Sequence, residues 1–268
     1  MKDKEPIFIK IGVALVFLLM ILINALANIL PINGITTGQV SDAYSNLFTP
    51  AGLTFSIWGI IYFLLALYVV YQLGVFGKKN FVERRQLFKE IGFYFIVSSL
   101  ANIFWIFAWH YRQIHFSLIF MVIILLSLIK ISEIFKQKQL TNKEKIVLRL
   151  PFSLYFGWIS VVTIANVIVF LVSLSWNGFG MSDQFWMILV LFIGTVIGLF
   201  RMIRDKDIIY GAVFLWAYLG ILIKHVSSNG FAGQYPEIIV GLVACLSIFL
   251  TANIFLLLKR KKIKKVEV

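Results

Sequence analysis

The sequence predicts an all-α integral membrane protein with eight transmembrane helices. Hydrophobic residues make up 60% of the 268 residues and charged residues only 14%, which leaves too little polar surface to cover a water-soluble fold. The apolar residues gather in eight long runs. All lysines and arginines except Arg112 and Lys224 lie in the termini or in alternate gaps between these runs. Because lysine and arginine mark short cytoplasmic loops, both termini are predicted to lie in the cytoplasm, at a bacterial inner membrane.

A transmembrane helix needs about 20 consecutive, predominantly apolar residues, and the eight runs reach or approach this length. The first run is too long for the apolar part of a signal peptide, so we expect it to stay in the chain as a helix. The sixth and seventh runs are the shortest and would tilt little or lie in thinner lipid. The predicted helices are residues 7–30, 51–76, 91–111, 115–135, 150–174, 184–201, 207–224 and 236–258.

The net charge of +13 could indicate a nucleic-acid partner. However, the basic residues lie at the predicted membrane edges, where anionic lipid of the bilayer is the simpler partner, so nucleic acid is not expected. The predicted cytoplasmic positions are Lys2, Lys4, Lys10, Lys78, Lys79, Arg84, Arg85, Lys89, Lys130, Lys136, Lys138, Lys143, Lys145, Arg149, Arg201, Arg204, Lys206, Lys259, Arg260, Lys261, Lys262, Lys264 and Lys265.

One gap, residues 31–50, is much longer than the others and holds no basic residue. It contains Pro31, Gly34, Gly38 and Pro50 and shows no clear secondary-structure pattern. Loops of this length in a compact protein are often functional. A solvated linker on the outer side is the alternative.

Acid–base or metal chemistry inside the membrane is not expected. All acidic residues lie in loops or at the ends of the apolar runs, whereas intramembrane carboxylates are costly and usually functional. The three histidines lack neighbouring carboxylates, so no metal site is predicted. Cys245 is the single cysteine, which rules out an internal disulfide, and no phosphate-binding Gly-Lys-Ser loop occurs. We therefore expect that the chain is not an enzyme and needs no cofactor.

Aromatic residues and amides recur within three of the predicted helices. Trp105 follows Asn102 by one helical turn, and Trp58 and Tyr62 are likewise one turn apart. At about 1.5 Å per residue, most of these residues lie below an interfacial aromatic belt. Aromatic walls with a few amides suit a pocket for an apolar ligand, although aromatic packing that fills the core is the alternative. The candidate ligand-binding residues are Trp58, Tyr62, Asn102, Trp105, Tyr155, Trp158 and Asn166.

These residues occur in segments that resemble the translocator protein, or tryptophan-rich sensory protein (TspO/MBR), family. The segment from Pro50 to Tyr62 is similar to the family's Pro-Gly-Trp-x-Phe…Trp-x-x-Leu-Tyr signature, although Leu53 replaces a tryptophan. Asn102-Ile-Phe-Trp105 resembles the Asn-x-x-Trp of the family's third helix. Tyr155-Phe-Gly-Trp158 with Asn166 resembles the Tyr-x-x-Trp…Asn of its fifth helix.

The resemblance implies a five-helix core that holds a tetrapyrrole- or sterol-like molecule, with residues 31–50 over the pocket. It implies a porphyrin or heme as a ligand and allows a homodimer. The family core has five helices, so residues 1–174 are predicted to form it. Residues 175–268 would then be an extension of three helices and a basic tail.

Three functions remain open. The leading one is a membrane protein that binds, senses or translocates a small, flat, hydrophobic ligand. The second is a permease-type subunit that works with a separate ATPase and docks it through residues 130–150. The third, an enzyme that degrades the bound tetrapyrrole, lacks the acid–base groups that it would need.

Overall fold

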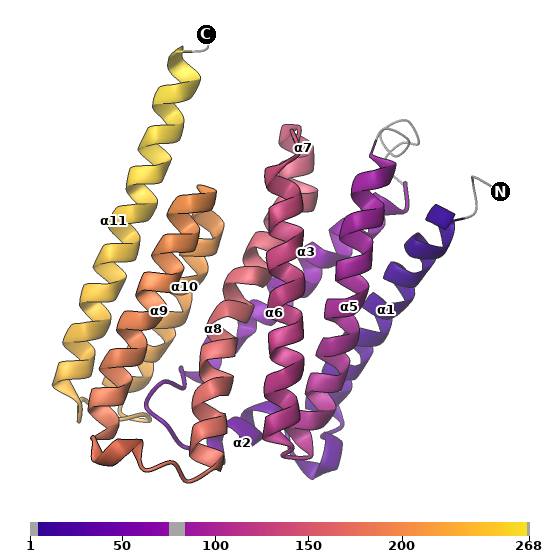
Figure 1. The fold of residues 1–268 in the computed structure, drawn as a ribbon. Helices are drawn as coiled ribbons and strands as arrows, with labels where there is room; N and C mark the ends of the chain where they lie inside the picture. The colour runs from indigo at the N-terminus through magenta and orange to yellow at the C-terminus, as the bar shows by residue number, and fades with distance from the viewer. Residues whose placement is uncertain (1–4, 75–83, 267–268) are drawn as a thin grey trace. The chain divides into compact units, whose positions relative to one another are not determined.

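The structure, a computed structural model, describes residues 5–74 and 84–266 (Figure 1). These residues form helices and no strand, and eight of the helices are long and apolar enough to cross a membrane. This confirms the predicted all-α multi-pass membrane fold. Lys2, Lys4, Lys78 and Lys79, together with the end of predicted helix 51–76, lie outside the described residues.

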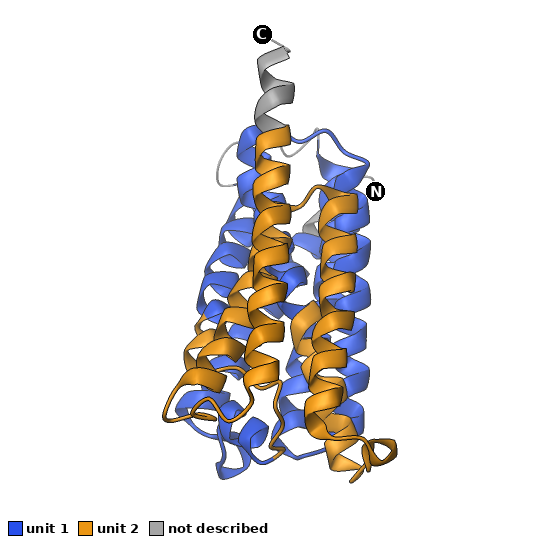
Figure 2. Cartoon of the chain, turned by 90° about the vertical axis from the view of Figure 1, so that its left-hand side faces the viewer, with its two compact units in different colours: residues 1–43, 57–159 blue, residues 44–56, 160–268 orange. Residues whose placement is uncertain are grey.

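The chain divides into two compact units (Figure 2). Unit 1 comprises Met1–Ala43 and Ile57–Ile159, and unit 2 comprises Tyr44–Ser56 and Ser160–Val268. Both the long loop at residues 31–50 and helix α8 (Leu150–Ser173) are therefore shared between the units. These units are defined by which residues pack together. The predicted division at residue 174 separates a family core from an extension, and it stays a prediction.

Unit 1 is built around α5 (Arg85–His110), which packs against α6 (Ile114–Lys136) and α1 (Glu5–Ile29). Helix α3 (Ile57–Gln72) also contacts α1. Gly92 allows α1 to approach α5 closely, because a Cβ atom at this position would lie 2.7 Å from Cγ2 of Ile9. Small residues permit such close helix packing within a bilayer.

Unit 2 contains three packed helices, α9 (Asp183–Asp205), α10 (Ile208–Val226) and α11 (Pro236–Val266). A short 3-10 helix, η2 (Gly52–Ser56), docks on α10. The backbone N–H of Ala51 donates to the Gly220 carbonyl over 3.0 Å, and Trp216 Nε1 donates to the Thr54 carbonyl over 2.9 Å. The segment that precedes α3 is thus fastened to unit 2.

The sixth helix is longer than predicted. It was predicted to end at residue 201, but α9 extends to Asp205 and has 23 residues. The extension is stabilised because Arg201 Nε lies 2.6 Å from a carboxylate oxygen of Asp205, one turn later on the same helix. The ion pair offsets the cost of burying both side chains. Lys206 then ends α9 in a left-handed conformation, and Asp207 caps α10 through the N–H of Tyr210.

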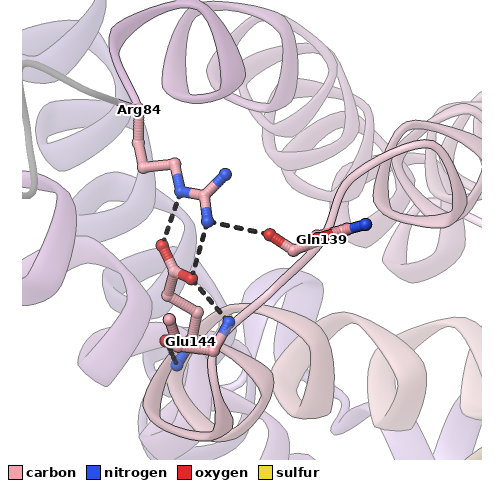
Figure 3. A network of polar contacts seen from close by, with 4 residues as sticks. Arg84, Gln139 and Glu144 are labelled. Atoms are coloured by element: carbon pink, nitrogen blue, oxygen red, sulfur yellow. Dashed lines mark hydrogen bonds and ion pairs between the residues drawn. The ribbon is translucent and has the colours of Figure 1, made fainter.

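A polar network in unit 1 holds the connection between α6 and α8 (Figure 3). Arg84 Nε donates to Glu144 Oε1 over 2.8 Å, while Arg84 Nη2 contacts both Glu144 Oε2 and the Gln139 carbonyl. Glu144 also accepts from the N–H of Thr141, whose hydroxyl caps α7 (Asn142–Glu144) in return. A π-helix, η3 (Lys145–Arg149), follows immediately. Helical structure therefore starts well before the predicted residue 150.

Replacing Glu144 by Gln keeps the shape of this side chain but removes its charge. We expect the free energy of unfolding to fall by about 1–2 kcal/mol, because two charge-assisted hydrogen bonds to Arg84 weaken. Denaturant unfolding of the detergent-solubilised protein measures the change. The control is Glu133→Gln, since Glu133 forms an exposed pair with Lys130 that contributes little. Equal losses in the two variants would contradict this role for Glu144.

Replacing Gly220 by Ala tests the docking of η2 on α10. A Cβ atom at Gly220 would overlap the Thr54 side chain, so we expect a loss of about 1–3 kcal/mol, as for other overpacked sites. Gly241→Ala is the matched control, because a Cβ there meets open space on α11. Thermal unfolding followed by circular dichroism should show a lower transition temperature for the Gly220 variant only.

Candidate functional site

An aromatic cluster in unit 1 brings together four of the predicted ligand-binding residues. Trp58 lies at its centre and stacks on Tyr62, with ring centroids 5.3 Å apart and planes 22° apart. Tyr155 and Trp158 meet Trp58 edge-on, at centroid distances of 6.0 and 6.2 Å. Helical spacing explains the arrangement, because residues three or four apart share one face of α3 or of α8. Two helices distant in the sequence thus supply one aromatic surface.

Helix α5 supplies two further predicted residues, Asn102 and Trp105. Asn102 is fully buried, and its Oδ1 accepts a hydrogen bond of 2.7 Å from Asn24 Nδ2 of α1. Trp105 is only 5% exposed and stacks on Trp109 with centroids 5.6 Å apart. Trp105 and Trp158 are both buried within the protein, so neither side chain points into the surrounding lipid.

Four buried polar atoms of these residues form no close, well-aligned hydrogen bond with another described residue. They are the hydroxyls of Tyr62 and Tyr155, Nδ2 of Asn102 and Nε1 of Trp105. The Tyr155 hydroxyl interacts electrostatically with Tyr62. Asn102 is a side-chain hydrogen-bond donor to the Tyr155 oxygen, but the hydrogen of the Tyr155 hydroxyl itself has no acceptor. Nearly all buried polar atoms in native proteins are paired, so each exception needs an explanation. All four atoms can donate a hydrogen bond, so together they suit a ligand that carries acceptor oxygens.

Asn166, the remaining predicted residue, is 2% exposed and belongs to unit 2. Its participation with the aromatic cluster of unit 1 stays a prediction. Asn24, in contrast, was not predicted. The available signal was an amide within the apolar run of the first helix, where a polar side chain normally seeks a partner on another helix.

The first part of the long loop is folded onto α5. Thr36 and Gln39 form a reciprocal cap on α2 (Thr37–Asp42), and α2 packs against α5. Trp109 Nε1 donates to the Thr37 carbonyl over 3.1 Å, and Asn33 Nδ2 donates to the His110 carbonyl over 3.0 Å. Trp109 and Asn33 therefore fasten this part of the loop to α5. This part of the loop is an ordered structure and not a solvated linker.

The aromatic cluster contains no ionisable carboxylate, amine or imidazole group. Among the described residues, no group of three or more His, Cys, Asp or Glu side chains is placed to hold a metal ion. The chemistry available at the cluster is therefore stacking on aromatic faces and hydrogen bonding by neutral donors. Such groups bind and orient a ligand.

A family model described as TSPO-like protein matches residues 10–256 of this chain. The match agrees with the resemblance carried by the helix motifs. It also continues through the three helices after residue 174, for which the resemblance to a five-helix core had offered no counterpart. No curated protein and no solved structure matches the chain.

Replacing Tyr155 by Phe tests whether its hydroxyl has a partner within the protein. We expect the free energy of unfolding of the ligand-free protein to fall by less than about 0.5 kcal/mol, because the hydroxyl donates no hydrogen bond and only its loose contact with Asn102 is lost. Tyr210→Phe is the control, since the buried Tyr210 hydroxyl donates to Ser160 Oγ over 2.9 Å, and its loss should cost about 1 kcal/mol. Chemical denaturation measures both. A larger loss for Tyr155→Phe than for Tyr210→Phe would contradict the assignment.

Proposed function

This chain belongs to the family of TSPO-like proteins, and from that premise we propose that unit 1 binds a flat hydrophobic ligand such as a tetrapyrrole or a sterol-like molecule. The protein would sense this ligand or translocate it. It would do so in a bacterial inner membrane with both termini in the cytoplasm, as the distribution of lysine and arginine favours.

The observation that carries this proposal is the set of buried donors beside the aromatic cluster that have no well-aligned acceptor. A buried hydroxyl or amide without a partner costs about 1–3 kcal/mol, and this chain places several of them around the Trp58 cluster. A ligand with carbonyl or carboxylate oxygens would satisfy the Tyr155 hydroxyl and Asn102 Nδ2. The ring faces would contribute offset stacking with a conjugated ligand.

A porphyrin or heme fits this set of residues. Its macrocycle offers a flat conjugated surface to Trp58 and Trp158, and its carboxylates offer acceptors to the tyrosine hydroxyls. Bound there, the tetrapyrrole would contribute its own light absorption and redox chemistry. The protein residues would orient the ring and exclude water, without acting as acids or bases.

Protoporphyrin IX is the probe that tests the site. We expect saturable quenching of intrinsic tryptophan fluorescence in the wild-type protein, because several tryptophans lie at the site. Loss of one donor, in Tyr155→Phe or Asn102→Leu, should weaken binding about two- to tenfold. Tyr68→Phe is a matched control. Its hydroxyl is also buried without a partner, but Tyr68 packs against Phe95 and Phe152, away from the Trp58 contacts.

The double variant Trp105→Ala with Trp158→Ala removes two walls of the proposed site and should abolish the saturable quench. Equal affinity in the wild type and in this variant would exclude these residues from the site. A porphyrin affinity that falls as much in Tyr68→Phe as in Tyr155→Phe would show a general effect of tyrosine removal.

A further inference from the structure

Unit 2 contains a separate cavity of about 460 Å³ that none of the predicted site residues lines. Its walls come from the end of α8, the 3-10 helix η4 (Gly178–Gly180), the start of α9 and the loop segment Ser45–Phe48. Every lining residue belongs to unit 2. Ile168, Leu171, Met187 and Val190 give the cavity an apolar side, while Asn46, Asn177 and Asp183 give it polar groups.

Two tryptophans form an aromatic corner in this cavity. The rings of Trp176 and Trp186 meet at 61° with centroids 4.7 Å apart. Trp186 Nε1 donates to the Gly178 carbonyl over 2.9 Å, so this N–H group is already paired and holds the indole in place. What Trp186 offers a ligand is the face of its ring, and such faces attract cations.

The backbone beside this corner is held in an uncommon conformation. Ser175 and Phe179 have φ angles of +52° and +56°, in the left-handed region that bulky residues rarely adopt. Gly178 cannot be replaced without a clash, since a Cβ atom there would lie 2.8 Å from Trp186 Nε1. Asn177 Oδ1 accepts from the N–H of Phe179 and stabilises the turn. Backbone strain of this kind concentrates at ligand-binding segments.

The opposite wall is also fixed by hydrogen bonds. Asn46 Oδ1 accepts from the backbone N–H groups of Phe48 and Thr49, each over 3.0 Å. His225 Nε2 of α10 bonds the Leu47 carbonyl over 2.9 Å. Walls that are rigid before a ligand arrives reduce the entropy that binding costs.

Asp183 is the one charged residue among those that line the cavity. Ser182 supplies the cap of α9 by accepting from the N–H of Phe185, so the cap does not use the Asp183 carboxylate. No ion pair of Asp183 occurs among the described residues. In a chain of net charge +13, this cavity therefore carries a local negative charge beside two aromatic faces.

We propose that this cavity binds an amphiphilic ammonium compound. Its cationic head would lie against Trp176 and Trp186 and near the Asp183 carboxylate, and its alkyl part would lie along Ile168, Leu171 and Met187. Aromatic faces with a carboxylate are the arrangement that recognises alkylated ammonium groups. An anionic ligand such as a porphyrin carboxylate would be repelled by Asp183, so this site is distinct from the one proposed in unit 1.

Isothermal titration calorimetry with hexyltrimethylammonium tests the proposal on the full chain in phosphatidylglycerol nanodiscs, with empty nanodiscs as the blank. We expect saturable binding that weakens about two- to fivefold in Asp183→Asn, because Asp183 is exposed and an exposed charge pair contributes little. Trp176→Leu should weaken it to a similar degree. Glu237→Gln is the matched control, because Glu237 is an exposed acid in the first turn of α11 and does not line the cavity.

An uncharged analogue with a tert-butyl group in place of the trimethylammonium group should bind more weakly than the cation. Equal affinity for both, or unchanged affinity in Asp183→Asn, would overturn the proposal. Phosphatidylcholine nanodiscs identify the source of the cation. Both lipids are compared in about 1 M salt, which screens the lipid surface charge. Weaker probe binding in phosphatidylcholine would then identify a lipid headgroup as the ligand, and unchanged binding would identify a free amphiphile.

Discussion

The absence of water from the hydrocarbon core of a bilayer is the constraint on which this structure depends. Backbone N–H and C=O groups form their hydrogen bonds within helices, because no water is available to them. Polar side chains must find partners within the protein or remain unpaired, which costs free energy. Most buried polar side chains of the two units meet this requirement locally. Asn24 pairs with Asn102, Tyr210 with Ser160, and Tyr218 with the Leu191 carbonyl. Other buried atoms, such as the Tyr68 hydroxyl, are also unpaired. The donors of Tyr62 and Tyr155 differ from Tyr68 in that they belong to the aromatic cluster around Trp58.

The long loop at residues 31–50 contributes its first part to unit 1 and its second part to unit 2. Its first part is fastened to α5 by Trp109 and Asn33, and its second part is fastened to α10 by His225. The following 3-10 helix η2 is fastened to α10 by Trp216. In each case a side-chain nitrogen (indole, amide or imidazole) bonds a backbone carbonyl. Hydrogen bonds at several points hold the loop in place without an internal disulfide, which a single cysteine could not form.

The sequence predicted the membrane class, the number of long helices and four contacting members of the aromatic cluster, because these depend on apolar run length and on helical spacing. It misplaced the end of α9, because Arg201 looked like a membrane-edge residue and only its pairing with Asp205 lets the helix continue. Helix α2 was missed although Thr36 and Gln39 carry a capping pattern, since a short polar helix has no apolar periodicity. The cavity around Trp176 and Trp186 depends on a contact between Ser45–Phe48 and residues far along the chain, which no local pattern predicts.

The hydrogen bonds that join Leu47 and Thr54 to α10 constrain the order in which the protein folds. The bond between Leu47 and His225 joins positions 178 residues apart, and that between Thr54 and Trp216 joins positions 162 residues apart. Contacts of such long range form late, because the intervening chain must first be ordered. During synthesis, these contacts cannot form until α10 has entered the bilayer. The hydrogen bond between Leu47 and His225 can therefore form only after the seventh long helix, α10, has been inserted.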